Sequence, residues 1–158
     1  MKIGFFAGSF DPFTIGHFHV AKQALEVFDK LVVGIGINES KTRRFDKLKM
    51  KDAIEKLFAS KNLNNVEVVI YDGLTVDTAK KFNATFLVRG LRDSADFEAE
   101  EKLAVANKQL SGLETIYFRT GDYGYVSSSL IYDLFTKNED VSNYVPEFVI
   151  DVLKQKTP

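Results

Sequence analysis

Apolar and polar positions alternate in blocks along the chain, and each block has the spacing of a strand or of a helix. Five short runs are almost continuously apolar, which is typical of strands buried on both faces of a sheet. Between them, apolar residues recur every three or four positions, the spacing of a helix that covers a core. The predicted strands are Lys2–Ala7, Lys30–Ile37, Val66–Tyr71, Thr85–Val88 and Thr115–Phe118. The predicted helices span residues 16–28, 47–60, 75–82, 94–110, 128–136 and 146–155.

Residues that favour helix ends stand where this pattern needs them. Pro146 suits the first turn of the last helix, and Gly112 is a stop signal after the fourth. The residues suited to cap helix N-termini are Thr14, Asp46, Asp93 and Ser127. The alternation predicts a doubly wound, Rossmann-like α/β sheet of five mainly parallel strands with helices on both faces. It also predicts one domain over residues 1–158, with the helices at about 128–155 packed on its core.

The composition narrows the class of protein. Of the 158 residues 45% are hydrophobic, enough for a packed core, and a formal charge of −1 is not typical of nucleic-acid binding. Cysteine is absent, which excludes disulfides and thiolate chemistry. No apolar run approaches the ~20 residues of a membrane span, and the first residues show no leader cleavage pattern. We therefore expect a cytoplasmic protein that binds neither nucleic acid nor membrane.

The candidate chemistry begins in the turn Gly8–His17, which follows the first predicted strand. His17 falls in the first turn of a helix, where unpaired N–H groups and the helix dipole attract anions. Even a neutral imidazole has one N–H to donate to a phosphate there. Two other phosphate motifs are excluded: no G-x-x-x-x-G-K-[ST] string occurs, and Gly34-Ile35-Gly36 lacks the third glycine of a dinucleotide fingerprint. His19 points roughly the opposite way from His17, so we expect it to be structural.

Further polar segments follow the other strands, at the edge where parallel sheets bind ligands. Lys41 follows the second predicted strand and Thr75 the third. Arg89 and Arg92 follow the fourth, and arginine can hold a phosphate with two parallel hydrogen bonds. Three serines at 127–129 begin a later helix and offer hydroxyl and backbone donors to a second anion.

Two strings carry a family resemblance. T-x-G-H at Thr14–His17, preceded by G-S-F-D-P, resembles the signature of the nucleotidyltransferase superfamily. The string R-G-L-R-x-x-x-D-F-E-x-E, which begins at Arg89, is similar to that of phosphopantetheine adenylyltransferases, bacterial-type enzymes of coenzyme A biosynthesis. The resemblance covers essentially the whole chain. Ser9 stands where many members have Thr, Tyr123 where some have Trp and Val126 where Ile is found, and each keeps the character of the side chain.

The resemblance implies an enzyme that joins ATP and 4′-phosphopantetheine to give dephospho-coenzyme A and pyrophosphate. His17 is then the residue that stabilises charge on the α-phosphate in the transition state. By the same resemblance, the pantetheine substrate is held by Ser9, Lys41, Thr75 and Arg89. ATP is held by Ser9, Phe10, His17, Gly90, Leu91, Arg92, Glu100, Tyr123, Gly124, Tyr125, Val126, Ser127, Ser128 and Ser129. Phe10, Asp11 and Pro12 are expected mainly to fix the path of the turn, and Arg43 and Arg44 have no role in the family pattern.

This chemistry needs little from the protein beyond positioning and charge. The attacking phosphate has a second pKa of about 6, so it is already an anion and needs no general base. Catalysis can then rest on orientation and charge stabilisation. Mg²⁺ is expected to enter with ATP, held by phosphates and water and not by protein side chains. The resemblance also implies a homohexamer and feedback inhibition by coenzyme A.

Two alternatives remain beside this interpretation. Nicotinamide-mononucleotide adenylyltransferases and glycerol-phosphate cytidylyltransferases share the turn, but they usually have H-x-G-H where this chain has Thr14. The cytidylyltransferases also end in an R-T-x-G-I-S-T-T string that is absent here. A nucleotide-binding regulator without turnover is the alternative from another class. The presence of His17 and of the Arg89 and Arg92 pair disfavours it.

Overall fold

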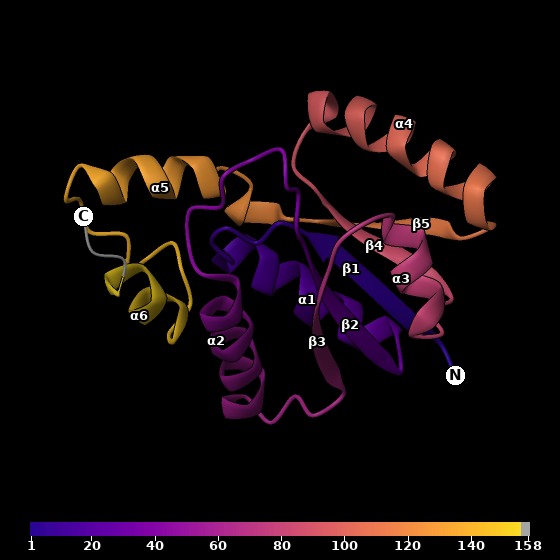
Figure 1. Cartoon of the computed structure of the whole chain (residues 1–158), viewed down its shortest axis with the longest axis horizontal. Coiled ribbons are helices and arrows are strands. Elements are labelled where there is room, and N and C mark those ends of the chain that lie inside the picture. The colour runs from indigo at the N-terminus through magenta and orange to yellow at the C-terminus, as the bar shows by residue number, and fades with distance from the viewer. Residues whose placement is uncertain (156–158) are drawn as a thin grey trace.

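A parallel sheet of five strands, in the order β3-β2-β1-β4-β5, forms the centre of the computed structural model (Figure 1). The structure describes residues 1–155, so the last three residues of the predicted domain lie outside this range. The strands are β1 (Ile3–Gly8), β2 (Lys30–Gly36), β3 (Val66–Tyr71), β4 (Phe86–Leu91) and β5 (Glu114–Arg119). The helices are α1 (Ile15–Val27), α2 (Lys47–Ser60), α3 (Thr75–Lys81), α4 (Ser94–Ser111), α5 (Ser128–Thr136) and α6 (Val149–Lys154), with a 3-10 turn η1 (Gly121–Tyr123).

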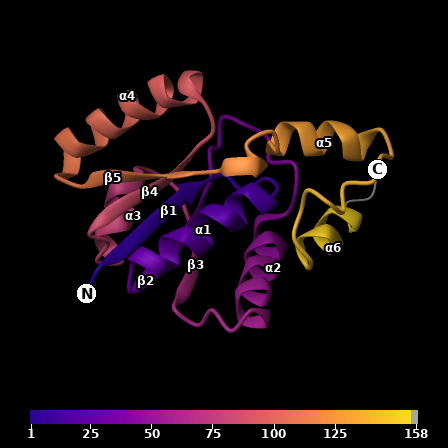
Figure 2. The ribbon, with the colours of Figure 1, turned by 180° about the vertical axis from the view of Figure 1, so that it is seen from behind.

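Helices cover both faces of the sheet, which confirms the predicted doubly wound α/β architecture. Figure 1 shows α3 and α4 on one face, and Figure 2 shows α1 and α2 on the other. The side chains of β1 alternate between the two cores, because successive residues of a strand point to opposite faces. Phe6 enters the larger core with α1 and α2, whereas Ile3, Phe5 and Ala7 enter the smaller core beneath α3.

β1 can lie close to β2 because Gly34 has no side chain. Phe5 is fully buried, and its ring lies over Gly34 in the neighbouring strand. A Cβ at position 34 would overlap that ring and come within 3.0 Å of the Tyr71 ring. The string Gly34-Ile35-Gly36, which resembles part of a dinucleotide motif, therefore serves the packing of the sheet.

The predicted caps at four helix N-termini are confirmed. The Thr14 and Ser127 hydroxyls accept the backbone N–H of His17 and of Leu130, at 3.2 and 3.1 Å. The carboxylates of Asp46 and Asp93 cap α2 and α4 in the same way. Gly112 ends α4 in the left-handed conformation with φ of 81°, which suits glycine and confirms the predicted stop.

Two predicted boundaries are wrong. β4 continues three residues beyond Val88, because Arg89–Leu91 pair with Tyr117–Arg119 of β5. Arg89 therefore lies inside a strand, although its charge suggested a loop. The last helix begins at Val149, not at position 146, since Pro146 precedes it and only accepts the N–H of Ile150.

The C-terminal helices extend the larger core. Ile131 of α5 and Val149 and Leu153 of α6 are fully buried in it, and α6 packs against α2. Both helices lie at the end of the molecule that carries α2 (Figure 1). Among residues 1–155, no helix has the length and apolar character that crossing a membrane requires.

Candidate active site

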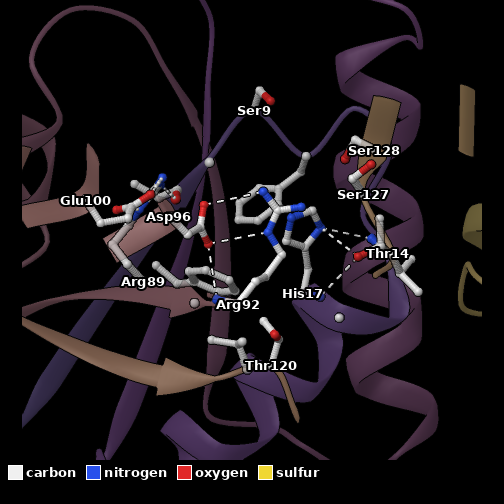
Figure 3. Close-up of a pocket in the computed structure, with 18 residues that line it drawn as sticks. Ser9, Thr14, His17, Arg89, Arg92, Asp96, Glu100, Thr120, Ser127 and Ser128 are labelled. Carbon is white, nitrogen blue, oxygen red and sulfur yellow. Dashed lines mark hydrogen bonds and ion pairs between the residues drawn. The ribbon is translucent and has the colours of Figure 1, made fainter. Parts of the chain in front are cut away.

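A cavity of about 260 Å³ opens at the carboxyl ends of β1 and β4 (Figure 3). The strand order changes direction between these two neighbours, the place where open α/β sheets bind ligands. His17 lies near the centre, with Arg92 and Asp96 to one side and Ser127 and Ser128 to the other (Figure 3). The predicted site residues that line this cavity are Ser9, Phe10, His17, Arg89, Gly90, Arg92, Glu100, Val126, Ser127 and Ser128.

Three other predicted residues line cavities that adjoin the first. Lys41 and Ser129 line a second cavity of about 300 Å³, which shares Ser9 and Ser128 with the first. Thr75 lines a small third cavity of about 30 Å³, which shares Arg89 and Glu100 with it. These predicted residues therefore line three adjoining cavities.

The remaining predicted residues lie outside the main cavity. Leu91 is the last residue of β4, and Gly124 follows η1. The Tyr123 ring packs on His19, with centroids 5.1 Å apart, which agrees with a structural role for His19. Tyr125 is 63% exposed and contacts the ring of Tyr144. The structure thus gathers the serine end of the Tyr123–Ser129 string at the cavity and leaves its tyrosines at the surface.

The first turn of α1 fixes which nitrogen of His17 carries the proton. Thr14 caps the helix with its hydroxyl, and its own backbone N–H donates to Nδ1 of His17 at 3.0 Å. This is a capping box in which histidine takes the place usually held by Glu or Gln. Because Nδ1 accepts a backbone N–H, it holds no proton, and the neutral ring must carry its proton on Nε2.

The surroundings keep this imidazole neutral. The rings of Phe6, Phe10 and Phe13 surround it, with centroids 6.3, 4.9 and 5.5 Å from its own. Burial, followed by the positive charges of Arg89 and Arg92, lowers the pKa of His17 to about 3. At neutral pH the side chain is therefore a neutral imidazole that can donate a hydrogen bond through Nε2.

Arg89 is held on both sides before any ligand arrives. Its Nε and Nη2 donate to the Glu100 carboxylate at 2.8 and 2.7 Å, and its Nη1 donates to the carbonyl of Ala7 at 2.5 Å. Burial opposes the charge, but the hydrogen-bonded Glu100 outweighs it, so the pKa of Arg89 is raised. A guanidinium has five N–H groups. Among residues 1–155, these contacts use three of the five N–H groups. One N–H on Nη1 and one on Nη2 remain for an anion in the cavity.

Arg92 is held more loosely. Its Nη2 and Nε lie 3.3 and 3.4 Å from the Asp96 carboxylate, and its side chain is 41% exposed. Exposed ion pairs at this spacing contribute little, about 0–1 kcal/mol, so a phosphate can compete with Asp96 for the guanidinium. Arg92 and Arg89 thus bring one adaptable and one fixed positive charge to the same cavity.

Sequence reasoning missed several residues around the site. Asp96 and Thr120 line the cavity, and the hydroxyl of Thr120 donates to the carbonyl of Leu91 at 3.3 Å. Arg43 and Arg44 bind the turn that carries Ser9 and the carboxylate of Asp11. Their spacing gives no local signal, because each contact joins segments about thirty residues apart.

Comparison with known proteins identifies the family. The model of the cytidylyltransferase-like family matches residues 5–133. A phosphopantetheine adenylyltransferase of Lachnoclostridium phytofermentans is 41% identical, over 99% of this chain and 96% of its own. Those of Bacteroides thetaiotaomicron and Phocaeicola vulgatus are 43% and 45% identical, each over 93% of this chain and 97% of its own. This chain belongs to the phosphopantetheine adenylyltransferase family. The predicted family is therefore confirmed.

Solved structures share the fold of this chain at much lower identity. A Vibrio parahaemolyticus structure assigned as a nicotinate-nucleotide adenylyltransferase has a TM-score of 0.69 and 17% identity, and the match covers 98% of this chain and all of that one. Thermotoga maritima TmcAL, bound with alpha-thio ATP, has a TM-score of 0.71 and 15% identity, covering 98% of this chain and 56% of its own. At these identities the likeness extends to the fold alone.

The neutral state of His17 can be tested directly. We expect the ring of this adenylyltransferase to stay neutral, with the proton on Nε2, between pH 5 and 8, because burial and two arginines lower its pKa to about 3. Long-range ¹H–¹⁵N spectra across this range report the tautomer, and a His19→Gln variant leaves only the His17 signals. A ring that titrates near pH 6.5, or that carries its proton on Nδ1, would contradict the assignment.

Proposed function

We propose that this chain transfers the adenylyl group of ATP to 4′-phosphopantetheine, releasing pyrophosphate and giving dephospho-coenzyme A. The observation that carries the proposal is the fixed Nε2–H of His17, in a cavity that also holds Arg89 and Arg92. Such a site offers donors and positive charge but no nucleophile and base pair. That is what phosphoryl transfer to an anionic acceptor requires. The relatives named for this activity support the choice of acceptor.

The two cavities that adjoin at Ser9 and Ser128 suit two substrates. We assign ATP to the cavity around His17, where Ser127 and Ser128 begin α5 and Arg92 can reach a phosphate. The pantetheine phosphate belongs at the junction beside Ser9, between Lys41 of the second cavity and the remaining N–H groups of Arg89. The third cavity, at Thr75, then receives the start of the pantetheine arm. Charge complementarity and the shared walls of the cavities support this arrangement.

The reaction is a direct displacement. An oxygen of the pantetheine phosphate forms a bond to the α-phosphorus of ATP, and the bond from that phosphorus to the bridging oxygen of the β-phosphate breaks. The electron pair leaves with pyrophosphate. No proton needs to move, since the attacking phosphate is an anion at neutral pH. Nε2–H of His17 donates to a non-bridging oxygen of the α-phosphate, and this hydrogen bond strengthens as negative charge builds up there.

Magnesium is part of the proposal as a companion of ATP. Within residues 1–155 there is no group of three or more metal-ligating side chains. The carboxylates of Asp96 and Glu100, which line the cavity, are paired with arginines. These residues fit an ion bound mainly by phosphates and water. When bound, such an ion neutralises charge on the departing pyrophosphate.

We also propose a homohexamer that acts in the cytoplasm and is inhibited by coenzyme A. Coenzyme A contains the product's two halves, so the same cavities can accept it. The support for assembly is α4, an 18-residue helix in which no residue is buried within one chain. Its exposed apolar side chains are Phe97, Leu103, Val105 and Leu110. A second copy covering this helix would remove them from water.

The acceptor can be tested by pyrophosphate release. With Mg²⁺ and ATP, we expect rapid release on addition of 4′-phosphopantetheine and none on addition of nicotinamide mononucleotide. Chelating the metal should abolish release without unfolding the protein, because the ion is not part of the fold. Release only with nicotinamide mononucleotide, or ATP binding without turnover on either acceptor, would contradict the proposed function.

The role of His17 predicts a specific kinetic loss. Removal of one donor to a developing charge costs about 10²–10³ in rate. We expect His17→Ala to lower kcat by that factor while KM for ATP changes little, because Arg92 and the serines of α5 still hold the nucleotide. Steady-state kinetics with both substrates measures the split, and His19→Ala is the matched control. Unchanged turnover in His17→Ala would exclude the role.

If the chain assembles through α4, charged substitutions on this helix should lower the mass of the assembly in solution. The wild-type protein is expected to sediment as a hexamer of its 17.8 kDa chain. Charges at two exposed positions, in Val105→Glu with Leu110→Glu, should dissociate it because they cannot be buried unpaired. Leu48→Glu, at an equally exposed apolar position on α2, should leave the mass unchanged. A wild-type protein that sediments as a monomer would refute the assembly.

A further inference from the structure

Arg43 holds the backbone of the turn that carries Ser9. Its Nη1 and Nη2 donate to the carbonyls of Ser9 and Phe10 at 2.5 and 3.0 Å, and its Nε donates to the carbonyl of Phe45 at 2.8 Å. The side chain is only 18% exposed, so these bonds are partly shielded from water. One guanidinium therefore joins the turn after β1 to the loop after β2.

Asp11 makes the reciprocal connection. Its Oδ2 accepts the backbone N–H of Arg44 at 2.7 Å, and its Oδ1 accepts that of Phe45 at 2.8 Å. The same Oδ1 lies 3.9 Å from Nη2 of Arg43. A cation from the second loop thus binds carbonyls of the first, and an anion from the first binds N–H groups of the second. We call this set of contacts the Asp11–Arg43 clasp.

The clasp holds a turn that is unfavourable by itself. Phe10 has φ of 46°, in the left-handed region that a bulky side chain rarely adopts. Its ring is nevertheless buried against Phe6, Phe13 and His17. A backbone in such a conformation persists only where its surroundings determine it. The two carbonyl contacts from Arg43 flank this residue, so they fix the turn in the conformation that brings Ser9 to both cavities.

We propose that Arg43 is a positioning residue that builds the acceptor-phosphate site by locking the Ser9 turn to the Lys41 loop. The inference rests on the proposed function, in which Ser9 and Lys41 hold the pantetheine phosphate. Lys41 lies two residues before Arg43 on an exposed loop, and Ser9 is exposed and lines the same cavity as Lys41. Arg43 also lines this cavity, but its three hydrogen bonds all go to backbone carbonyls of Ser9, Phe10 and Phe45. It sets the distance between Ser9 and Lys41.

This role predicts a loss confined mainly to the acceptor. In Arg43→Ala we expect KM for 4′-phosphopantetheine to rise roughly tenfold to a hundredfold, the scale of a misplacement of about 1 Å. KM for ATP and kcat should change less, since Nδ1 of His17 is held by Thr14 and Arg92 is held by Asp96, and neither contact belongs to the clasp. Arg43→Lys keeps the charge and the apolar stem but cannot reach three carbonyls with one ammonium group. It should therefore retain most of the defect.

Two controls separate positioning from simple attraction. Lys47→Ala removes an exposed positive charge four residues away and should leave KM for phosphopantetheine within about twofold. Amide hydrogen exchange should show faster exchange at Arg44 and Phe45 in Arg43→Ala, because their bonds to Asp11 weaken when the clasp opens. Full recovery in Arg43→Lys, or a loss in Lys47→Ala equal to that in Arg43→Ala, would show that charge alone acts and would overturn the proposal.

Calorimetric titration with 4′-phosphopantetheine in the absence of ATP distinguishes a failure of the positioning role of Arg43 from a failure of the proposed function. Wild-type protein that binds phosphopantetheine but releases no pyrophosphate contradicts the proposed function, while the affinities of the variants still decide the role of Arg43. We expect weaker binding in Arg43→Ala and Arg43→Lys and unchanged binding in Lys47→Ala. Equal affinity in all four proteins would overturn the positioning role even if turnover is normal.

Discussion

The site depends on one topological constraint, the reversal of strand order beside β1. The chain leaves β1 toward β2 and β3, and then crosses to the other side of β1 to form β4 and β5. The segments that follow β1 and β4 must therefore turn away from each other, which leaves a space between neighbouring strand ends. His17 comes from the first of these segments and Arg92 from the second, while Arg89 lies in the last half of β4 itself. Residues more than seventy positions apart meet because two adjacent strands are continued in opposite directions.

Within that space, the contacts in the first turn of α1 both stabilise the helix and orient the imidazole of His17. Thr14 satisfies a backbone N–H of the helix with its hydroxyl, a contact that contributes about 1 kcal/mol in typical helices. Its own N–H occupies Nδ1 of His17 and so decides the tautomer. The phenylalanines that surround the ring also form part of the larger core. The donor at the centre of the site is consequently oriented by the same contacts that hold the helix to the sheet.

The sequence was most informative where the chemistry is local. Strand and helix periodicity, the caps at Thr14 and Ser127, and the T-x-G-H turn each depend on residues within a few positions of one another. The end of β4 was misjudged because Arg89 is polar in sequence, whereas its pairing with Glu100 lets it lie inside the sheet. Arg43 received no role from the sequence because its partners are backbone carbonyl groups, which every residue has and which therefore leave no motif. The roles of the individual ligand-binding residues stay predictions.

The wall that the ATP cavity shares with the Lys41 cavity, at Ser9 and Ser128, has a consequence for what happens after the reaction. Two substrates enter separately, and each loses its own translational freedom on binding. Under the proposed function the product is one molecule that occupies both spaces. Once one half is bound, the other half meets its cavity at an effective concentration that can reach the millimolar range. Rebinding of a half-released product then competes with its escape, so the adjacency that makes the new bond also favours a long residence time for the molecule that contains it.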